Sequence, residues 1–339
     1  MDLLLHIGTE KTGTTTIQKF LMENQEILES AGIFLPSSLG HPLHRALAAI
    51  ASNDEFIDEF FQRKGLLDIA ERRDAKSIWW EAFVAEVQDN NMARAIISSE
   101  HLQSRLQKSE EIFRLRSMLS SLFSSIKILI YIRDPLETAL SLYSTAVKNS
   151  SVALAPPGPD DPYFNIIVNH AATIQKWAAA FGIENIKVRL FMKECFVNGD
   201  LLDDFISACD LPAAEWKRPV PQNERLSRLG LALLARLNRR LPEFGVGGVY
   251  NPERGNLDGF FEKHFNAGPP YIPEMSLVEA YEQAMSDSNE WVRERFFPER
   301  ATLFPRRNPE NIGPNAPVDP ELDKVADLIV DIWKLRKSV

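Results

Sequence analysis

The chain has 339 residues, of which 45% are hydrophobic and 25% are charged, and its formal net charge is −9. This composition is that of a soluble globular protein with enough residues for one large domain or two smaller ones. The acidic balance argues against a broad basic surface for nucleic acid or a polyanionic polymer, and no apolar run reaches the ~18–20 residues that cross a bilayer.

The cysteines and the N-terminus indicate the compartment. Cys195 and Cys209 have no companion cysteines or histidines at metal-ligand spacing, so we expect two reduced thiols and no metal site. The first eight residues, MDLLLHIG, indicate a strand and lack the basic region and cleavage site of a signal peptide. We therefore expect a cytoplasmic protein without a membrane span.

Four short apolar runs predict strands at residues 3–7, 95–98, 126–132 and 186–192. Each run is continuously apolar, which is typical of strands buried on both faces of a parallel sheet. Helical spacing predicts helices between them, at residues 17–31, 136–147 and 166–181. Strands that alternate with helices predict an α/β fold, a parallel sheet flanked by helices with ligands beyond the C-terminal strand ends.

The C-terminal part differs in character. Residues 226–241 predict an amphipathic helix, and the glycine- and proline-rich stretches 244–256, 266–273 and 304–320 predict loops. We expect a core over residues 1–215 and a helical and loop extension over residues 216–339 that packs on the same domain. The proline-rich stretch 155–162 predicts a loop, either a lid or acceptor-site wall over the strand ends or a simple surface connection.

The first candidate site follows the first strand, where residues 5–18 read LHIGTEKTGTTTIQ. A helix that begins near Thr14 offers unpaired N–H groups and a partial positive charge to an anion, and Gly13 allows close backbone approach. Lys11 adds a full charge. Further donors are the hydroxyl groups of Thr12, Thr14, Thr15 and Thr16. A Walker A loop would need lysine directly after this glycine, which the chain lacks; a threonine-rich helix cap with a solvated lysine is the simpler alternative.

The order Lys11-Thr-Gly-Thr-Thr resembles the 5′-phosphosulfate loop of sulfotransferases that use 3′-phosphoadenosine 5′-phosphosulfate (PAPS). Residues 128–143 resemble the 3′-phosphate motif of the same family, in which a strand ends in arginine and a serine follows eight residues later, here Arg133 and Ser141. Arg133 can grip a phosphate with two parallel hydrogen bonds, or it can be a structural ion-pair partner. Asp134, directly before Pro135, is interpreted as a helix cap and not as a Walker B magnesium ligand.

The resemblance also implies a catalytic base at the end of the strand between the two motifs, a histidine in some branches and a glutamate in others. Glu100 falls at this position, and His101 is the alternative because a shift by one residue would exchange them. Glu100 could instead be an acid at a helix start. His41 and His44 are candidates for the wall of the acceptor site. The remaining histidines have no partner pattern and are interpreted as structural or surface residues: His6, His170 and His264.

Through about residue 211 the chain resembles soluble, bacterial-type members of this family. The resemblance implies a P-loop-like parallel sheet and a transferase that moves the sulfonate of PAPS to the hydroxyl or amine of a small-molecule or glycan acceptor, by analogy a carbohydrate or glycolipid. It implies no metal and 3′,5′-adenosine diphosphate (PAP) as product. The basic, glycine-containing loop of the cytosolic branch is not found near the C-terminus, where Arg306 and Arg307 are candidate substitutes.

Two other functions remain open. A P-loop kinase would transfer phosphate from ATP and would require magnesium, so transfer that persists in excess EDTA separates it from a sulfotransferase. A non-catalytic relative would bind a nucleotide as a sensor or scaffold, and product formed from radiolabelled PAPS would exclude it.

Overall fold

The computed structural model describes residues 1–220, 225–244, 250–308, 312–313 and 321–335. By packing, the chain divides into two units, each made of separate stretches of sequence. The first unit comprises Met1–Asp134, Ile166–Pro221 and Ser288–Ala301, and the second comprises Pro135–Asn165, Gln222–Asp287 and Thr302–Val339. The expected division of the chain at residue 215 stays a prediction.

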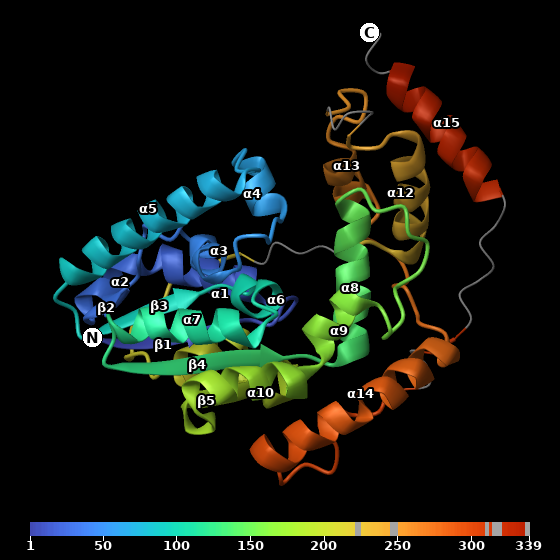
Figure 1. Cartoon of the computed structure of the whole chain (residues 1–339). Helices are drawn as coiled ribbons and strands as arrows, with labels where there is room; N and C mark the ends of the chain where they lie inside the picture. The colour runs from blue at the N-terminus through green and yellow to red at the C-terminus, as the bar shows by residue number, and fades with distance from the viewer. Residues whose placement is uncertain (221–224, 245–249, 309–311, 314–320, 336–339) are drawn as a thin grey trace. The chain divides into compact units, whose positions relative to one another are not determined.

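The first unit contains a five-stranded sheet in the order β2-β3-β1-β4-β5, in which every neighbouring pair is parallel (Figure 1). The strands are β1 (Asp2–His6), β2 (Ile33–Phe34), β3 (Arg94–Ser98), β4 (Ser125–Ile132) and β5 (Ile186–Leu190). The four expected strands are confirmed, and β2 is an additional edge strand. Because β2 has two residues and pairs only with β3, it is too short to give a periodic signal.

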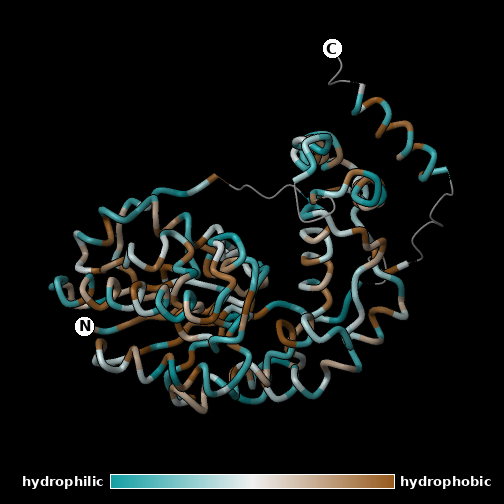
Figure 2. The backbone as a smooth tube through the Cα atoms, turned by 45° about the horizontal axis from the view of Figure 1, so that its top comes forward, coloured by the Kyte–Doolittle hydropathy of each residue, from teal (hydrophilic) through white to brown (hydrophobic). Residues whose placement is uncertain are grey.

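The central strand β1 is buried on both faces, as its continuous apolar run predicts. Leu4 belongs to the core that α1 and α11 cover. Leu3 and Leu5 point to the opposite face and are equally buried. Figure 2 shows hydrophobic stretches of the backbone in the interior of this unit. The expected α/β fold with helices around a parallel sheet is therefore confirmed.

The helices of the first unit surround the strands (Figure 1). They are α1 (Thr14–Glu23), α2 (Gln25–Ser30), α3 (Arg45–Ala51), α4 (Glu59–Arg63), α5 (Ile69–Gln88), α6 (His101–Arg105), α7 (Ser109–Ser120), α10 (His170–Phe181) and α11 (Leu201–Ala208). Three short 3₁₀ helices flank β5 and precede α11: η1 (Ile183–Asn185), η2 (Lys193–Cys195) and η3 (Val197–Gly199). Helices α9 (Pro162–Val168) and α14 (Met275–Phe296) each contribute residues to both units.

Two expected helices are each broken by an asparagine, so their predicted extents were wrong. Residues 17–31 form α1 and α2, because the Asn24 amide turns back to the Phe20 carbonyl at 2.8 Å and also pairs with the backbone of Lys217. Residues 166–181 include the end of α9 and all of α10, because the Asn169 side chain caps α10 by accepting from the N–H of Ala172 at 3.1 Å. Local side-chain bonds of this kind compete with a continuous helix.

The second unit is helical, as expected for the C-terminal region. It contains α8 (Pro135–Lys148), α12 (Arg228–Arg240), α13 (Leu257–His264) and α15 (Glu321–Leu335). Apolar residues from all four helices share one core, with Val147, Leu234, Phe261 and Trp333 among them. The predicted amphipathic helix is confirmed as α12, and the expected helix at 136–147 is confirmed as α8.

The predicted loop at 266–273 is confirmed, whereas the loops at 244–256 and 304–320 fall partly outside the described residues. Residues 155–161 form no helix or strand, and Pro162 begins α9. The role of this stretch as a lid stays a prediction. Within the described residues, no helix is both long and apolar enough to span a bilayer.

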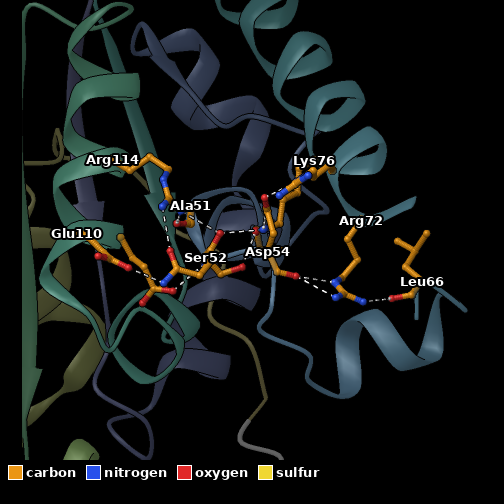
Figure 3. A network of polar contacts seen from close by, with 12 residues as sticks. Ala51, Ser52, Asp54, Leu66, Arg72, Lys76, Glu110 and Arg114 are labelled. Atoms are coloured by element: carbon orange, nitrogen blue, oxygen red, sulfur yellow. Dashed lines mark hydrogen bonds and ion pairs between the residues drawn. The ribbon is translucent and has the colours of Figure 1, made fainter. Parts of the chain in front are cut away.

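A network of backbone carbonyls and cationic side chains joins the end of α3 to α5 and α7 (Figure 3). Arg114 donates to the Ala51 carbonyl at 2.8 Å, and Lys76 donates to the Ser52 carbonyl at 2.8 Å. Arg72, which is 1% exposed, donates to the carbonyls of Asp54 at 2.9 Å and Leu67 at 2.6 Å. These bonds fix the C-terminal end of α3 and satisfy carbonyls that helix and turn geometry leaves open.

We expect Arg72→Met to lower the free energy of unfolding by about 2 to 3 kcal/mol, because methionine keeps an apolar stem but leaves the carbonyls of Asp54 and Leu67 without their charged donor. Arg73→Met is the matched control. Arg73 pairs with the same Asp54 at 2.6 Å through an exposed side chain, and its loss should have a much smaller effect. Urea denaturation of both variants measures the difference, and equal losses would contradict a buried role for Arg72.

Candidate active site

The loop between β1 and α1 begins as a continuation of the sheet and ends as a helix start. The N–H of Thr9 donates to the Tyr131 carbonyl at 2.8 Å, and the N–H of Tyr131 donates to the Gly8 carbonyl at 2.7 Å. Gly13 then takes the N-cap position of α1, where its carbonyl accepts from the N–H of Ile17 at 3.1 Å. The loop is therefore anchored at both ends on β4 and α1.

Gly13 has a positive φ of 74°, which favours glycine, and a Cβ atom there would lie 2.4 Å from the Leu201 side chain. Glycine provides no side-chain cap for the N–H groups of the first turn of α1, and that turn contains no acidic residue. The N–H groups and partial positive charge of this helix start are the elements that bind anions in proteins.

The four threonines of this segment differ in their surroundings. The Thr12 hydroxyl donates to the Thr9 carbonyl at 2.6 Å and so holds the loop together. The Thr14 hydroxyl forms a hydrogen bond with the Glu100 carboxylate. Thr15 is exposed and Thr16 is half-buried in the first turn of α1. Thr12 and Thr14 thus organise the site internally, while Thr15 and Thr16 stand in the turn that would face an anion.

The structure brings Lys11 and Arg133 together. Arg133 follows β4 directly, and its Nη1 donates to the backbone carbonyl of Lys11 at 3.1 Å. Its guanidinium also lies 5.5 Å from the centre of the Phe191 ring, which follows β5. Lys11 has a φ of 65°, an uncommon left-handed conformation for a residue with a side chain. Two cationic residues from the ends of neighbouring strands β1 and β4 therefore meet at one edge of the sheet.

His170, the first residue of α10, fixes the backbone of Arg133. Its Nε2 donates to the Arg133 carbonyl at 2.8 Å, and the side chain is fully buried. Burial lowers the pKa of His170 to about 4, so the ring is neutral near pH 7. Of the two interpretations, structural or surface, His170 fits the structural one, and it contacts the backbone of the site; no sequence pattern linked it to Arg133, which lies 37 positions away.

Ser141 and Asp134 fall on either side of the division between the units. Asp134 ends a segment of the first unit, while Ser141 is a half-buried residue of α8 in the second. The expected proline at the first position of the helix is confirmed, since α8 begins at Pro135. The pairing of Ser141 with Arg133 on one phosphate stays a prediction.

Glu100 lies just after β3 and is held from the side of α1. Gln18, in α1, donates from Nε2 to Glu100 Oε2 at 2.7 Å, in addition to the bond from Thr14. Although Glu100 occupies the N-cap position of α6, its side chain makes no capping hydrogen bond there. Glu100 therefore does stand at a helix start, but its side chain is held from α1 and caps no N–H group of α6.

Burial raises the pKa of Glu100 above its ordinary value of 4.5, and the nearby carboxylate of Glu10 adds to the rise. The bonds from Gln18 and Thr14 act in the opposite direction because they stabilise the ionised form. A buried carboxyl with a raised pKa that still ionises is suited to accept a proton.

His101 has a different environment. It begins α6, and its Nδ1 is buried without a hydrogen-bond partner among the described residues. Burial, and then the positive charges of Arg45 and Arg105, lower its pKa to about 3. The ring is therefore neutral but a weak base.

The other histidines and the C-terminal arginines occupy distinct places. His44 is buried, with Nδ1 3.1 Å from the N–H of Ser98 and Nε2 2.9 Å from the Pro36 carbonyl, so both ring nitrogens are used by backbone. The His41 ring packs edge-on against it, with centroids 5.8 Å apart. In the second unit, Arg307 forms an ion pair with Glu137, and Arg306 is exposed.

Two contacts of the site were missed from sequence. Gln18 lies one helical turn after Thr14, so helical spacing places both on one face of α1, but nothing in the sequence indicates that Glu100 lies opposite. His170 gave no signal at all. Among the described residues, no group of three or more histidine, cysteine, aspartate or glutamate side chains could hold a metal ion.

Comparisons with known proteins add a fold likeness of limited strength. No family model matches the chain, and no curated protein is significantly similar to it. Among solved structures, the chain is similar to a sulfotransferase from Alicyclobacillus acidocaldarius, with 13% identity over 86% of this chain and 94% of that chain and a TM-score of 0.41. A TM-score of this size is too low to transfer a function from that protein to this chain.

Proposed function

We propose that the chain is a sulfotransferase that uses PAPS as donor. The supporting observation is the hydrogen bond between Arg133 and the Lys11 carbonyl, which brings two candidate anion sites together at the ends of β1 and β4. Ligands of parallel α/β sheets bind at this edge. The start of α1 and Lys11 hold the 5′-phosphosulfate, with hydroxyl groups from Thr15 and Thr16. Arg133 holds the 3′-phosphate, and a part for Ser141 in this contact stays a prediction of the sequence motif.

The proposed reaction is direct transfer. The acceptor oxygen or nitrogen forms a bond to sulfur while the bond from sulfur to the bridging oxygen breaks, and PAP leaves. Glu100 takes the acceptor proton as the new bond forms. Lys11 and the N–H groups of α1 stabilise the negative charge that grows on the departing phosphate, the same electrostatic principle as in phosphoryl transfer.

The acceptor is proposed only as a class, a small molecule or glycan with a free hydroxyl or amine group. A carbohydrate or a sugar-bearing lipid is the acceptor that the family resemblance of the two motifs suggests. A cytoplasmic location is proposed from the cysteine usage alone.

Calorimetry with PAP, AMP, ADP and ATP tests the donor assignment. We expect PAP to bind best, because AMP and PAP differ only in the 3′-phosphate that Arg133 is proposed to hold. Sulfuryl transfer from radiolabelled PAPS that persists in excess EDTA would separate this function from a magnesium-dependent kinase. Tighter binding of ATP than of PAP would contradict the proposal.

Arg133→Ala should weaken PAP binding at least tenfold, because a hydrogen bond to a charged group contributes about 1.5–3 kcal/mol. Its affinity for AMP should change much less, so the preference for PAP over AMP should shrink. Arg94→Ala is a matched control, since Arg94 starts β3 at the opposite edge of the sheet and donates to the Cys209 carbonyl. Equal losses for PAP and AMP would mean that Arg133 supports the loop and does not recognise the 3′-phosphate.

A further inference from the structure

Gln18 is a buried polar residue on the inner face of α1. Its side chain is 1% exposed, and Nε2 is 2.7 Å from Glu100 Oε2. The same nitrogen is 3.5 Å from the Ser98 carbonyl, a longer contact, and Oε1 is buried without a partner among the described residues. The shortest polar contact of this glutamine is therefore with the candidate base.

The second donor to Glu100 comes from the same helix. Thr14 and Gln18 are four positions apart, and side chains at this spacing are neighbours on one helix face. Both donate to the Glu100 carboxylate. Gly8 completes the enclosure, because a Cβ atom there would lie 2.9 Å from both Cα and Cβ of Glu100. The helix whose N-terminus forms the anion site thus also holds the carboxylate.

We propose that Gln18 is a positioning residue that orients the Glu100 carboxylate relative to the phosphosulfate loop. Because α1 carries both the anion site and the donors to Glu100, one rigid element sets the separation between the donor and the base. This role rests on the proposed function, in which Glu100 accepts the acceptor proton. Small displacements of a base reduce its effectiveness, so a dedicated contact of this kind has a catalytic consequence.

A structural role would be to fill the space between α1 and β3 with an amide. The electrostatics of Glu100 distinguish the two roles. A donor to the ionised carboxylate lowers the pKa of Glu100, so its removal must raise that pKa. Other charged groups that act on Glu100 are Glu10 from the phosphate loop, which raises its pKa, and Arg45 from α3.

Gln18→Met tests the inference, with Gln103→Met as a matched control. Gln103 is 3% exposed, and its Nε2 donates to the Ile166 carbonyl at 2.9 Å and to the Thr173 hydroxyl at 3.1 Å, not to Glu100. NMR of isotope-labelled glutamate side chains measures the pKa of Glu100 directly, and the Glu100→Gln variant identifies its signal. We expect the pKa of Glu100 to rise in Gln18→Met and to stay unchanged in Gln103→Met.

A second variant keeps the test independent of a packing defect. Gln18→Glu places another carboxylate beside Glu100 and should raise its pKa further than Gln18→Met does. PAP affinity, measured by calorimetry, should change less than about twofold in both Gln18 variants, because Gln18 is one turn away from the anion site. An unchanged pKa of Glu100, or an equal rise in Gln103→Met, would overturn the role of Gln18.

Kinetics complete the experiment. In single turnovers of radiolabelled PAPS with water as the acceptor, Gln18→Met should be roughly tenfold slower or more on the acidic side of the pH profile. Its acidic limb should lie at higher pH than that of the unmodified chain. A raised pKa of Glu100 with an unmoved limb would overturn the positioning role. Failure of the unmodified chain to bind PAP would instead overturn the proposed function, and it is detected without any variant.

Discussion

Replacing Glu100 with glutamine should lower the rate of sulfuryl transfer by roughly 10²–10⁴-fold, the contribution that a positioned general base makes. Glutamine has nearly the same shape and retains an oxygen that can accept from Gln18 and Thr14. The variant therefore removes the proton acceptor while the surrounding contacts can persist. Single-turnover transfer from radiolabelled PAPS to the best acceptor of a hydroxyl and amine screen measures the loss.

The pH profile decides whether Glu100 or His101 is the base. Because burial raises the pKa of Glu100, its carboxylate is lost as the pH falls through a value above 4.5, and activity should fall in that range. His101 has a pKa of about 3, so a profile that depended on His101 would retain activity down to about that pH. His101→Gln should leave the acidic limb in place if Glu100 is the base.

The pH dependence of stability gives an independent test of the raised pKa of Glu100. A raised pKa in the folded chain means that the protonated form of Glu100 is favoured, so its contribution to stability is fully present below the ordinary value of 4.5 and is lost as the pH rises through the folded value. Glutamine does not ionise, so the Glu100→Gln variant does not lose this stability as the pH rises. The variant should melt at a higher temperature than the unmodified chain near neutral pH, and the difference should disappear below pH 4.5. A variant that is inactive but not stabilised would contradict a buried, ionising Glu100.

The phosphate loop could be predicted from the sequence because its residues are close together along the chain. Lys11, Gly13 and the start of α1 lie within four consecutive residues, and Gly13 is required by its positive φ and its contact with Leu201. Arg133 and Pro135 likewise mark the end of one strand and the start of the next helix. Parallel strands place such segments at a common edge, which is why the sequence alone predicts the approach of Arg133 to Lys11.

The contacts that sequence reasoning missed are set by tertiary packing. Gln18 and Glu100 are 82 positions apart, and only the pairing of β1 with β3 brings their elements together. At Asn24, a bond to the backbone of Lys217, 193 positions away, adds to the local bond to Phe20. A glutamine or an asparagine is not unusual in a helix, so Gln18 and Asn24 give no signal in the sequence. The role of each residue depends on its partner in the folded chain, and hydrophobic periodicity does not predict that partner.

In the proposed function, the Lys11 side chain stabilises the negative charge that grows on the leaving phosphate. Lys11→Ala should lower the rate of the transfer step by roughly 10²–10³-fold, the loss found when one donor to a developing negative charge is removed. Acceptor affinity should change little. The variant should lose more affinity for PAP than for PAPS. The negative charge that Lys11 is proposed to stabilise is fully present on the 5′-phosphate of PAP, whereas in PAPS it develops only as the bond to sulfur breaks.

Lys11→Ala should remove the side-chain charge without disturbing the loop. Arg133 contacts the backbone carbonyl of Lys11, and that bond does not require the lysine side chain. Alanine and lysine also bear the left-handed φ of 65° with similar strain, since both have a Cβ atom. Lys11→Arg should restore part of the rate, and Lys19→Ala, in the helix α1 that follows the loop, should leave it unchanged. If Lys11→Ala weakened PAPS and PAP equally and left the transfer step intact, lysine would contribute binding alone, and the N-terminus of α1 would have to stabilise the leaving group by itself.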